Sequence, residues 1–143
     1  MHASHILRDK GGEVFTVEPR FTLIDAARVL ADKRVGAAVV VDETGKPVGV
    51  FSERDLARLI GQSGAPALEQ SVSSVMSTDL VTASPAESID GLMEIMTDRR
   101  VRHVIIMDDE SMVGMVSIGD VVKRKIAAAE AEAESLKAYI EMA

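Results

Sequence analysis

Apolar and polar positions are arranged along this chain in a pattern that occurs twice. In each copy, apolar residues recur at i, i+3, i+4 and i+7, the spacing of one face of an amphipathic helix. They are Leu23, Ala26, Ala27 and Leu30 in the first copy and, 66 positions later, Ile89, Leu92, Met93 and Met96 in the second. An apolar run follows each stripe, at 38–41 and 104–107, and its β-branched residues predict a buried strand.

Both copies predict the same order of elements, β-α-β-β-α. The first has a strand at 14–17, a helix from Thr22, strands at 38–41 and 48–51, and a helix from Ser52; the second has them at 80–83, Ser88, 104–107, 113–116 and Ser117. A repeat of about 60 residues is too small to bury a good core alone, so the copies should pack on each other. The sequence therefore predicts an α/β (α+β) fold of two repeats about a pseudo-two-fold axis.

The repeat also predicts domain boundaries. Residues 1–60 hold the first repeat with an N-terminal segment, 61–74 a linker, 75–126 the second repeat, and 127–143 a C-terminal helix. The last segment is rich in Ala and Glu, and its composition favours a helix. A contact within its own subunit and a contact with another subunit explain its narrow apolar stripe equally well. The stripe consists of Ile126, Ala129, Ala133, Leu136 and Ile140.

Composition narrows the classes of function. The chain has 16 Lys and Arg against 23 Asp and Glu, and only 3% aromatic residues, which argues against nucleic-acid binding. It has no Cys, which excludes thiol catalysis and thiolate metal sites. The longest apolar stretch, 35–41, is far shorter than the ~20 residues of a membrane span. The first residues also lack the apolar core of a signal peptide. We expect a cytoplasmic protein that binds neither membranes nor nucleic acid.

Each copy contains two short motifs at corresponding places. Thr-x-x-Pro occurs at 16–19 and 82–85, and Gly-x-x-Ser-x-x-Asp at 49–55 and 114–120. With these motifs and the apolar strand between them, residues 14–126 resemble a tandem pair of CBS domains. The resemblance implies a stand-alone regulatory or sensor module that forms a homodimer and signals to a separate protein. Its ligand would be AMP, ADP, ATP, S-adenosylmethionine or NAD, in the cleft between the repeats. The alternative is a ligand-free scaffold that binds a partner protein through the C-terminal helix and the CBS disc, the flat assembly of four domains that two CBS pairs form when they dimerise.

By this resemblance, ribose hydroxyls bind Asp55 and Asp120, and phosphate lies at Ser52 and Ser117. A carboxylate can accept two hydroxyl donors, and a helix N-terminus presents free N–H groups to phosphate. However, Ser-x-x-Asp is also close to a helix capping box, and residues 22–25 have the same spacing where the family binds no ribose. Spacing alone favours capping, and both roles can coexist.

Other residues assigned by the resemblance differ between the copies. Arg54 could add a bidentate contact to phosphate, but the second copy has Gly119 there, so we expect the sites to differ in affinity or in preferred ligand. Thr16 and Thr82 would contact the nucleotide, although a β-branched residue at a strand end needs no such role. Adenine is expected beside the backbone of two segments, Arg34, Val35, Gly36 and Ala37 in the first copy and Arg100, Val101, Arg102 and His103 in the second.

An enzyme is the competing class, for example a hydrolase with Ser52 or Ser117 as nucleophile. Such a serine needs a base within hydrogen-bond reach, and neither Ser-x-x-Asp motif contains a His. The chain also lacks a Walker-type loop and a HExxH motif. His2 and His5 are three positions apart, but they are a poor signal for a metal site. We expect no enzyme activity, no metal and no catalytic cofactor.

Overall fold

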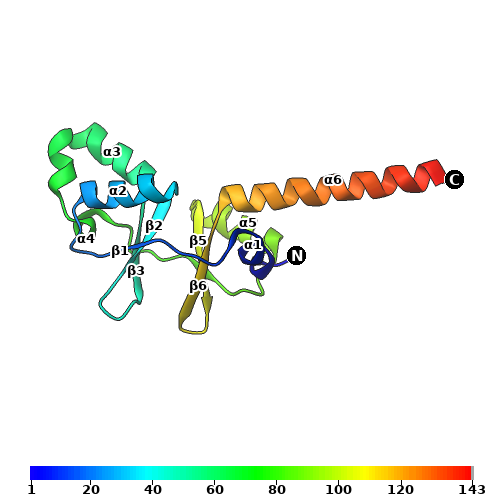
Figure 1. Cartoon of the computed structure of the whole chain (residues 1–143), viewed down its shortest axis with the longest axis horizontal. Coiled ribbons are helices and arrows are strands. Elements are labelled where there is room, and N and C mark those ends of the chain that lie inside the picture. Colours follow the sequence, from blue (N-terminus) through cyan, green and yellow to red (C-terminus); the bar gives the residue numbers. More distant parts are fainter. Residues whose placement is uncertain (143) are drawn as a thin grey trace. The chain divides into compact units, whose positions relative to one another are not determined.

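The structure, a computed structural model, describes residues 1–142, and the chain divides into two compact units. Unit 1 comprises Met1–Gly12, Val81–Asp109 and the chain from Gly114 onward, and unit 2 comprises Glu13–Leu80 and Glu110–Val113. Within the described residues, the chain forms two three-stranded sheets, ordered β1-β2-β3 and β4-β5-β6 (Figure 1). The predicted mixed α/β fold with a C-terminal helix is confirmed.

Unit 2 contains the elements predicted for the first repeat. The predicted elements are β1 (Thr16–Val17), α2 (Leu23–Lys33), β2 (Ala37–Val41), β3 (Pro47–Ser52) and α3 (Glu53–Ser63). The unit also contains the 3-10 helix η1 (Ala65–Glu69) and the short helix α4 (Val72–Val75), which the sequence did not predict. Strand β1 runs parallel to β2, and β2 runs antiparallel to β3 with Ala37 opposite Ser52. This register brings the beginning of β2 and the end of β3 to the same end of the sheet.

The core of unit 2 forms because α2 and the strands bury their apolar faces together. Helix α2 begins where the sequence predicts, since Thr22 Oγ1 accepts a hydrogen bond from Asp25 N at 3.3 Å. Burial of each large apolar side chain stabilises the fold by about 1.5–3 kcal/mol. The buried cluster consists of Val17, Leu23, Ala26, Leu30, Ala38, Val40, Phe51 and Val72.

Unit 1 repeats this order around the second sheet. Its elements are α1 (Ala3–Lys10), β4 (Thr82–Ala83), α5 (Ile89–Arg99), β5 (His103–Asp108), the part of β6 (Ser111–Ser117) from Gly114 onward, and α6 (Ile118–Met142). Strand β4 runs parallel to β5, as β1 does to β2. Three predicted stripe residues of α5, Ile89, Leu92 and Met96, are buried, whereas Met93 is 38% exposed and does not belong to the core.

The N-terminal segment departs from the predicted boundaries. It forms α1, a helix that the sequence did not predict, and it belongs to unit 1 with the second repeat. The buried Ala3 donates its N–H to the carbonyl of Glu87 at 2.8 Å. His2 and His5 stabilise the start of this helix, because His2 N donates a hydrogen bond to His5 Nδ1 at 2.9 Å.

Two other segments also differ from the predicted boundaries. Residues 61–74 do not form a plain linker, because they contain the end of α3, η1 and most of α4, and Val72 is buried in the core of unit 2. The C-terminal helix does not start at 127 but is continuous from Ile118 to Met142. Among residues 1–142, no helix combines the length and the apolar character that crossing a bilayer requires.

Candidate functional site

In unit 2, the Ser-x-x-Asp motif forms the N-terminus of α3. Ser52 ends β3, and its Oγ accepts a hydrogen bond from Asp55 N at 3.2 Å. In return, Asp55 Oδ2 accepts from Ser52 N at 2.9 Å and from Ser52 Oγ at 3.0 Å. The other carboxylate oxygen, Oδ1, accepts from the exposed Arg58 at 3.3 Å. The capping interpretation is therefore confirmed, and Oδ1 takes no part in the cap.

The second motif caps the start of α6 in unit 1 in the same way, but it has an additional partner. Asp120 Oδ2 accepts from Ser117 N at 2.9 Å, and Asp120 N donates to Ser117 Oγ at 3.1 Å. The last residue of α1, Lys10, donates from Nζ to the same Oδ2 at 2.7 Å and to the carbonyl of Met115 at 3.0 Å. A cation from the N-terminal helix thus engages the carboxylate that the family resemblance assigns to ribose.

Lys10 also changes the acidity of Asp120. Burial raises the pKa of this carboxyl, but the hydrogen bond and charge of Lys10, together with the hydrogen bonds of Ser117, outweigh burial. The net pKa of Asp120 therefore lies below its ordinary value of 3.8. This carboxylate is held in its charged form by a neighbour outside the repeated sequence.

The segments expected beside adenine lie next to these helix starts. Gly36 O accepts a hydrogen bond from Glu53 N at 2.9 Å in unit 2, and Arg102 O accepts from Ile118 N at 2.8 Å in unit 1. A Cβ on Gly36 would come within 3.3 Å of Oε1 at the end of the exposed Glu53 side chain, which also places this segment beside the start of α3. In each unit the structure therefore brings the predicted adenine segment and the predicted ribose motif together.

The turn into each of these segments is also repeated. Arg34 ends α2 with φ 55° and Arg100 ends α5 with φ 53°, both in the left-handed region that few side chains adopt. Of the residues that follow, Ala37 is buried, Val35 and Val101 are half-buried, and so is His103, the residue that corresponds to Ala37. The bulkier His103 marks a real difference between the two segments.

Thr16, Thr82 and Arg54 were also predicted as site residues, and all three are exposed. Thr16 and Thr82 lie in β1 and β4 and are exposed, so neither fills a core. Arg54 is exposed in the first turn of α3, and Gly119 lies at the corresponding position of α6. The asymmetry in charge predicted from the sequence is therefore present at the two helix starts.

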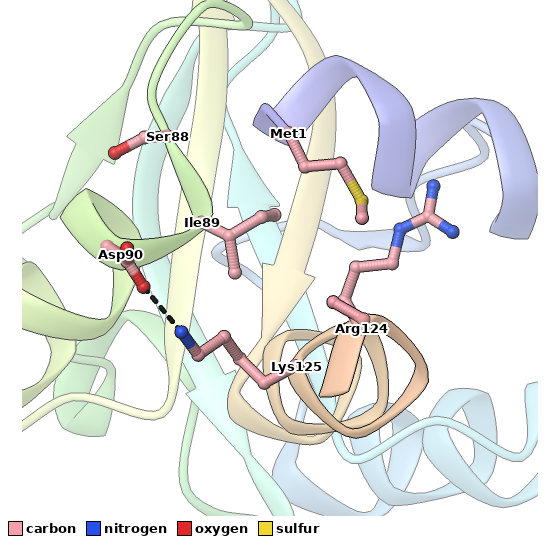
Figure 2. A pocket seen from close by; sticks show the side chains of 7 residues that line it. Met1, Ser88, Ile89, Asp90, Arg124 and Lys125 are labelled. Atoms are coloured by element: carbon pink, nitrogen blue, oxygen red, sulfur yellow. Dashed lines mark hydrogen bonds and ion pairs between the residues drawn. The ribbon is translucent and has the colours of Figure 1, made fainter. Parts of the chain in front are cut away.

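A separate pocket of about 260 Å³ lies within unit 1, between α5, α6 and the first residue of the chain. Figure 2 shows Lys125 of α6 reaching the carboxylate of Asp90 on α5, at 2.8 Å, beside the side chains of Ile89 and Met1. The Lys125 contact lowers the pKa of Asp90. None of the predicted site residues lines this pocket, so it does not correspond to the predicted ligand site.

The equivalent motifs, turns and sheets of the two units define a tandem-repeat α/β module. The sequence pattern of the CBS domain matches residues 4–62 and 72–126. The chain belongs to the CBS-domain family and carries a tandem pair of these domains.

Known proteins similar to this chain include relatives of different lengths. The CBS domain-containing protein CBSX3, mitochondrial, of Arabidopsis thaliana is 36% identical over 124 residues, which are 84% of this chain and 60% of that relative. The crystal structure of the CBS-domain containing protein ATU1752 from Agrobacterium tumefaciens has a TM-score of 0.84 and 40% identity, covering 87% of this chain and 92% of that one. PAE2072 from Pyrobaculum aerophilum, solved complexed with AMP, has a TM-score of 0.74 and 26% identity over 84% of this chain and 89% of its own.

Proposed function

We propose that the protein is a regulatory module that binds adenosine-containing ligands at its two repeats and signals to a separate partner protein. One observation carries the proposal: in each unit, the segment assigned to adenine is hydrogen-bonded to the helix start assigned to ribose and phosphate. The bond joins Glu53 N to Gly36 O in unit 2 and Ile118 N to Arg102 O in unit 1. The AMP complex of the similar protein PAE2072 supports this class of ligand.

In unit 2, the chemistry at the start of α3 suits a nucleotide. Asp55 Oδ2 accepts the capping hydrogen bond from Ser52 N, while Oδ1 accepts one from Arg58, whose side chain is 57% exposed. An exposed ion pair of this kind contributes about 0–1 kcal/mol, so a ribose hydroxyl can replace the guanidinium at Oδ1. Arg54 adds a cation beside the N–H groups of the helix start, where a phosphate is stabilised by charge and by hydrogen bonds.

In unit 1, the same motif suits a nucleotide less well. Lys10 Nζ lies 2.7 Å from Asp120 Oδ2, and Gly119 provides no side-chain cation for a phosphate. A ribose hydroxyl must therefore compete with an ammonium group for Asp120. The tighter of the two sites in this proposal is the one in unit 2.

The module is proposed to bind without catalysis. Ser52 Oγ accepts from Asp55 N and donates to Asp55 Oδ2, and Ser117 Oγ accepts from Asp120 N. These contacts stabilise helix starts, whereas a serine nucleophile needs a general base that is itself oriented by a third group.

Calorimetric and thermal titration of the full chain tests the proposal. AMP, ADP, ATP, S-adenosylmethionine and NAD are added separately, and at least one should raise the melting temperature. A ligand at a hundredfold excess over its dissociation constant adds about 2.7 kcal/mol of stability. If all five leave the melting curve unchanged at millimolar concentration, ligand binding is refuted and the interaction scaffold is the function that remains.

A pair of matched variants tests the role of the carboxylate. Asp55→Asn should weaken binding about 10- to 100-fold, because a hydrogen bond to a charged group is worth about 1.5–3 kcal/mol. Asp25→Asn is the control, because Asp25 makes the same cap with Thr22 at a helix where no ribose is assigned. Equal losses of affinity in the two variants would mean that Asp55 acts only as a cap.

A further inference from the structure

Helix α6 carries a regular apolar stripe along most of its length. The stripe residues recur at alternating intervals of four and three, which is the a and d spacing of a coiled coil. Ile126, Leu136 and Ile140 are 54%, 57% and 66% exposed. The full stripe, in the order d, a, d, a, d, a, is Val122, Ile126, Ala129, Ala133, Leu136 and Ile140.

This stripe is not the face by which α6 packs on its own unit. The packed face contains Val121, which is buried, and Arg124, whose guanidinium forms an ion pair with Asp9 at 2.6 Å. With 3.6 residues per turn, the apolar stripe lies roughly 130° around the helix axis from that face. Every described residue from 126 to 142 is exposed, and in Figure 1 this part of α6 extends beyond α5 and α1. Docking within unit 1 therefore does not explain the stripe.

The charges beside the stripe change sign from one heptad to the next. The g positions hold Lys125, Glu132 and Tyr139, and the e positions hold Lys123, Glu130 and Lys137. In a parallel coiled coil, each g residue faces the e residue of the following heptad on the other helix. Lys125 would then face Glu130 of the partner subunit, and Glu132 would face Lys137 of the partner subunit. Two-fold symmetry doubles these attractive pairs to four.

An antiparallel pair with full overlap has the opposite electrostatics. It places Lys123 opposite Lys137 of the partner subunit and Glu130 opposite Glu130 of the partner subunit, and both juxtapositions repel. An anionic membrane surface is also disfavoured, because residues 126–142 contain four Glu and one Lys. The charge pattern thus selects one occupant for the stripe.

We propose that α6 forms a parallel, in-register, two-stranded coiled coil with α6 of a second copy of this chain. The proposal is independent of nucleotide binding. Ala129 and Ala133 form two layers of small side chains in the middle of the interface. Because Lys125 already forms an ion pair with Asp90 at 2.8 Å, Glu132 and Lys137 carry most of the charge selectivity. The interface is short, and dimerisation is expected to depend on protein concentration.

Cysteine cross-linking of the full chain tests the arrangement directly, because the chain has no Cys of its own. Ala129→Cys and Ile140→Cys, made separately, should each give a disulfide-linked dimer on mild oxidation. Ala131→Cys is the control, because position 131 lies at f on the outer side of the pair. An antiparallel dimer brings at most one of these two positions close to its own copy. Cross-linking at only one position, or at neither above the control, overturns the proposal.

Charge reversal provides a second test, measured by sedimentation of the full chain. Glu132→Lys replaces two attractive pairs with two repulsive ones and should raise the dimer dissociation constant about tenfold. Adding Lys137→Glu in the same chain should restore the wild-type value. Glu134→Lys, the same change at the outer b position, should leave the dissociation constant unchanged. Failure of the double variant to recover, or an equal effect of Glu134→Lys, contradicts the parallel arrangement.

Discussion

The start of α3 in unit 2 and the start of α6 in unit 1 share one motif but differ in their surroundings. In both, Ser and Asp cap the helix with nearly equal hydrogen-bond lengths. Asp55 receives a further contact from Arg58 of its own helix, whereas Asp120 receives one from Lys10, which is 110 positions away in the sequence. The repeat therefore determines the local geometry, and a segment outside the repeat determines how available the carboxylate is.

The largest expected effect concerns what the two units have in common. Leu23 in α2 and Leu92 in α5 are both completely buried. Leu23→Ala and Leu92→Ala should each reduce the free energy of unfolding by about 2–5 kcal/mol, because each leaves a cavity in a packed core. Chemical denaturation followed by circular dichroism measures both. Ile24→Ala, at a position that is 36% exposed, is the control. A loss below 1 kcal/mol at only one of the two leucines would show that the cores are not equivalent.

The next effect concerns the cation that distinguishes the two helix starts. Arg54→Gly should weaken binding of AMP at unit 2 about 10- to 100-fold, because a charge-assisted hydrogen bond to phosphate is lost. Gly119→Arg should strengthen binding at unit 1, and a Cβ there meets no atom closer than Ser117 Oγ at 3.6 Å. Calorimetry with AMP and with adenosine separates the phosphate effect. If Arg54→Gly weakens adenosine and AMP equally, Arg54 does not contact phosphate.

Much of the fold was predictable because the signals are periodic and repeated. The stripe of α2 and the apolar runs of β2 and β5 are long enough to define their elements, and the second copy supports the first. Helix α1 has eight residues and only two buried ones, Ala3 and Ile6, so its pattern is too short to indicate a helix or the unit it joins.

The candidate site was predictable to a similar extent. Ser52, Asp55, Ser117 and Asp120 could be found because they lie within a few positions of one another in a repeated motif. Sequence reasoning missed Lys10, since no spacing rule connects residues 110 positions apart. The one available signal was a basic residue in the last turn of α1, and many exposed helices have that feature.

A smaller effect is expected from removing Lys10 itself. Lys10→Met leaves Asp120 without its ammonium partner, so adenosine should bind at unit 1 more tightly. The expected gain in affinity is a few-fold, because an exposed ion pair contributes about 0–1 kcal/mol. The corresponding change in unit 2, Arg58→Met, should alter adenosine affinity less, because Arg58 is more exposed and its contact is longer. Titration calorimetry measures both. Weaker binding of adenosine to Lys10→Met would show that Lys10 assists the ligand instead of competing with it.

The smallest effect is the pH dependence of the Lys10–Asp120 pair. Its carboxyl has a pKa in the folded state below the ordinary value of 3.8, so the pair contributes stability above pH 3.8 and loses it as the pH falls through the folded-state value. Lys10→Met should therefore reduce the free energy of unfolding at pH 7 by at most about 1 kcal/mol, since Lys10 is partly exposed. The difference from wild type should shrink as denaturant titrations are moved below pH 3.8. Lys123→Met, which removes one charge from the exposed side of α6, is the control. A difference that stays constant from pH 7 to this acidic range would mean that Lys10 stabilises α1 through its contact with the Met115 carbonyl and not through Asp120.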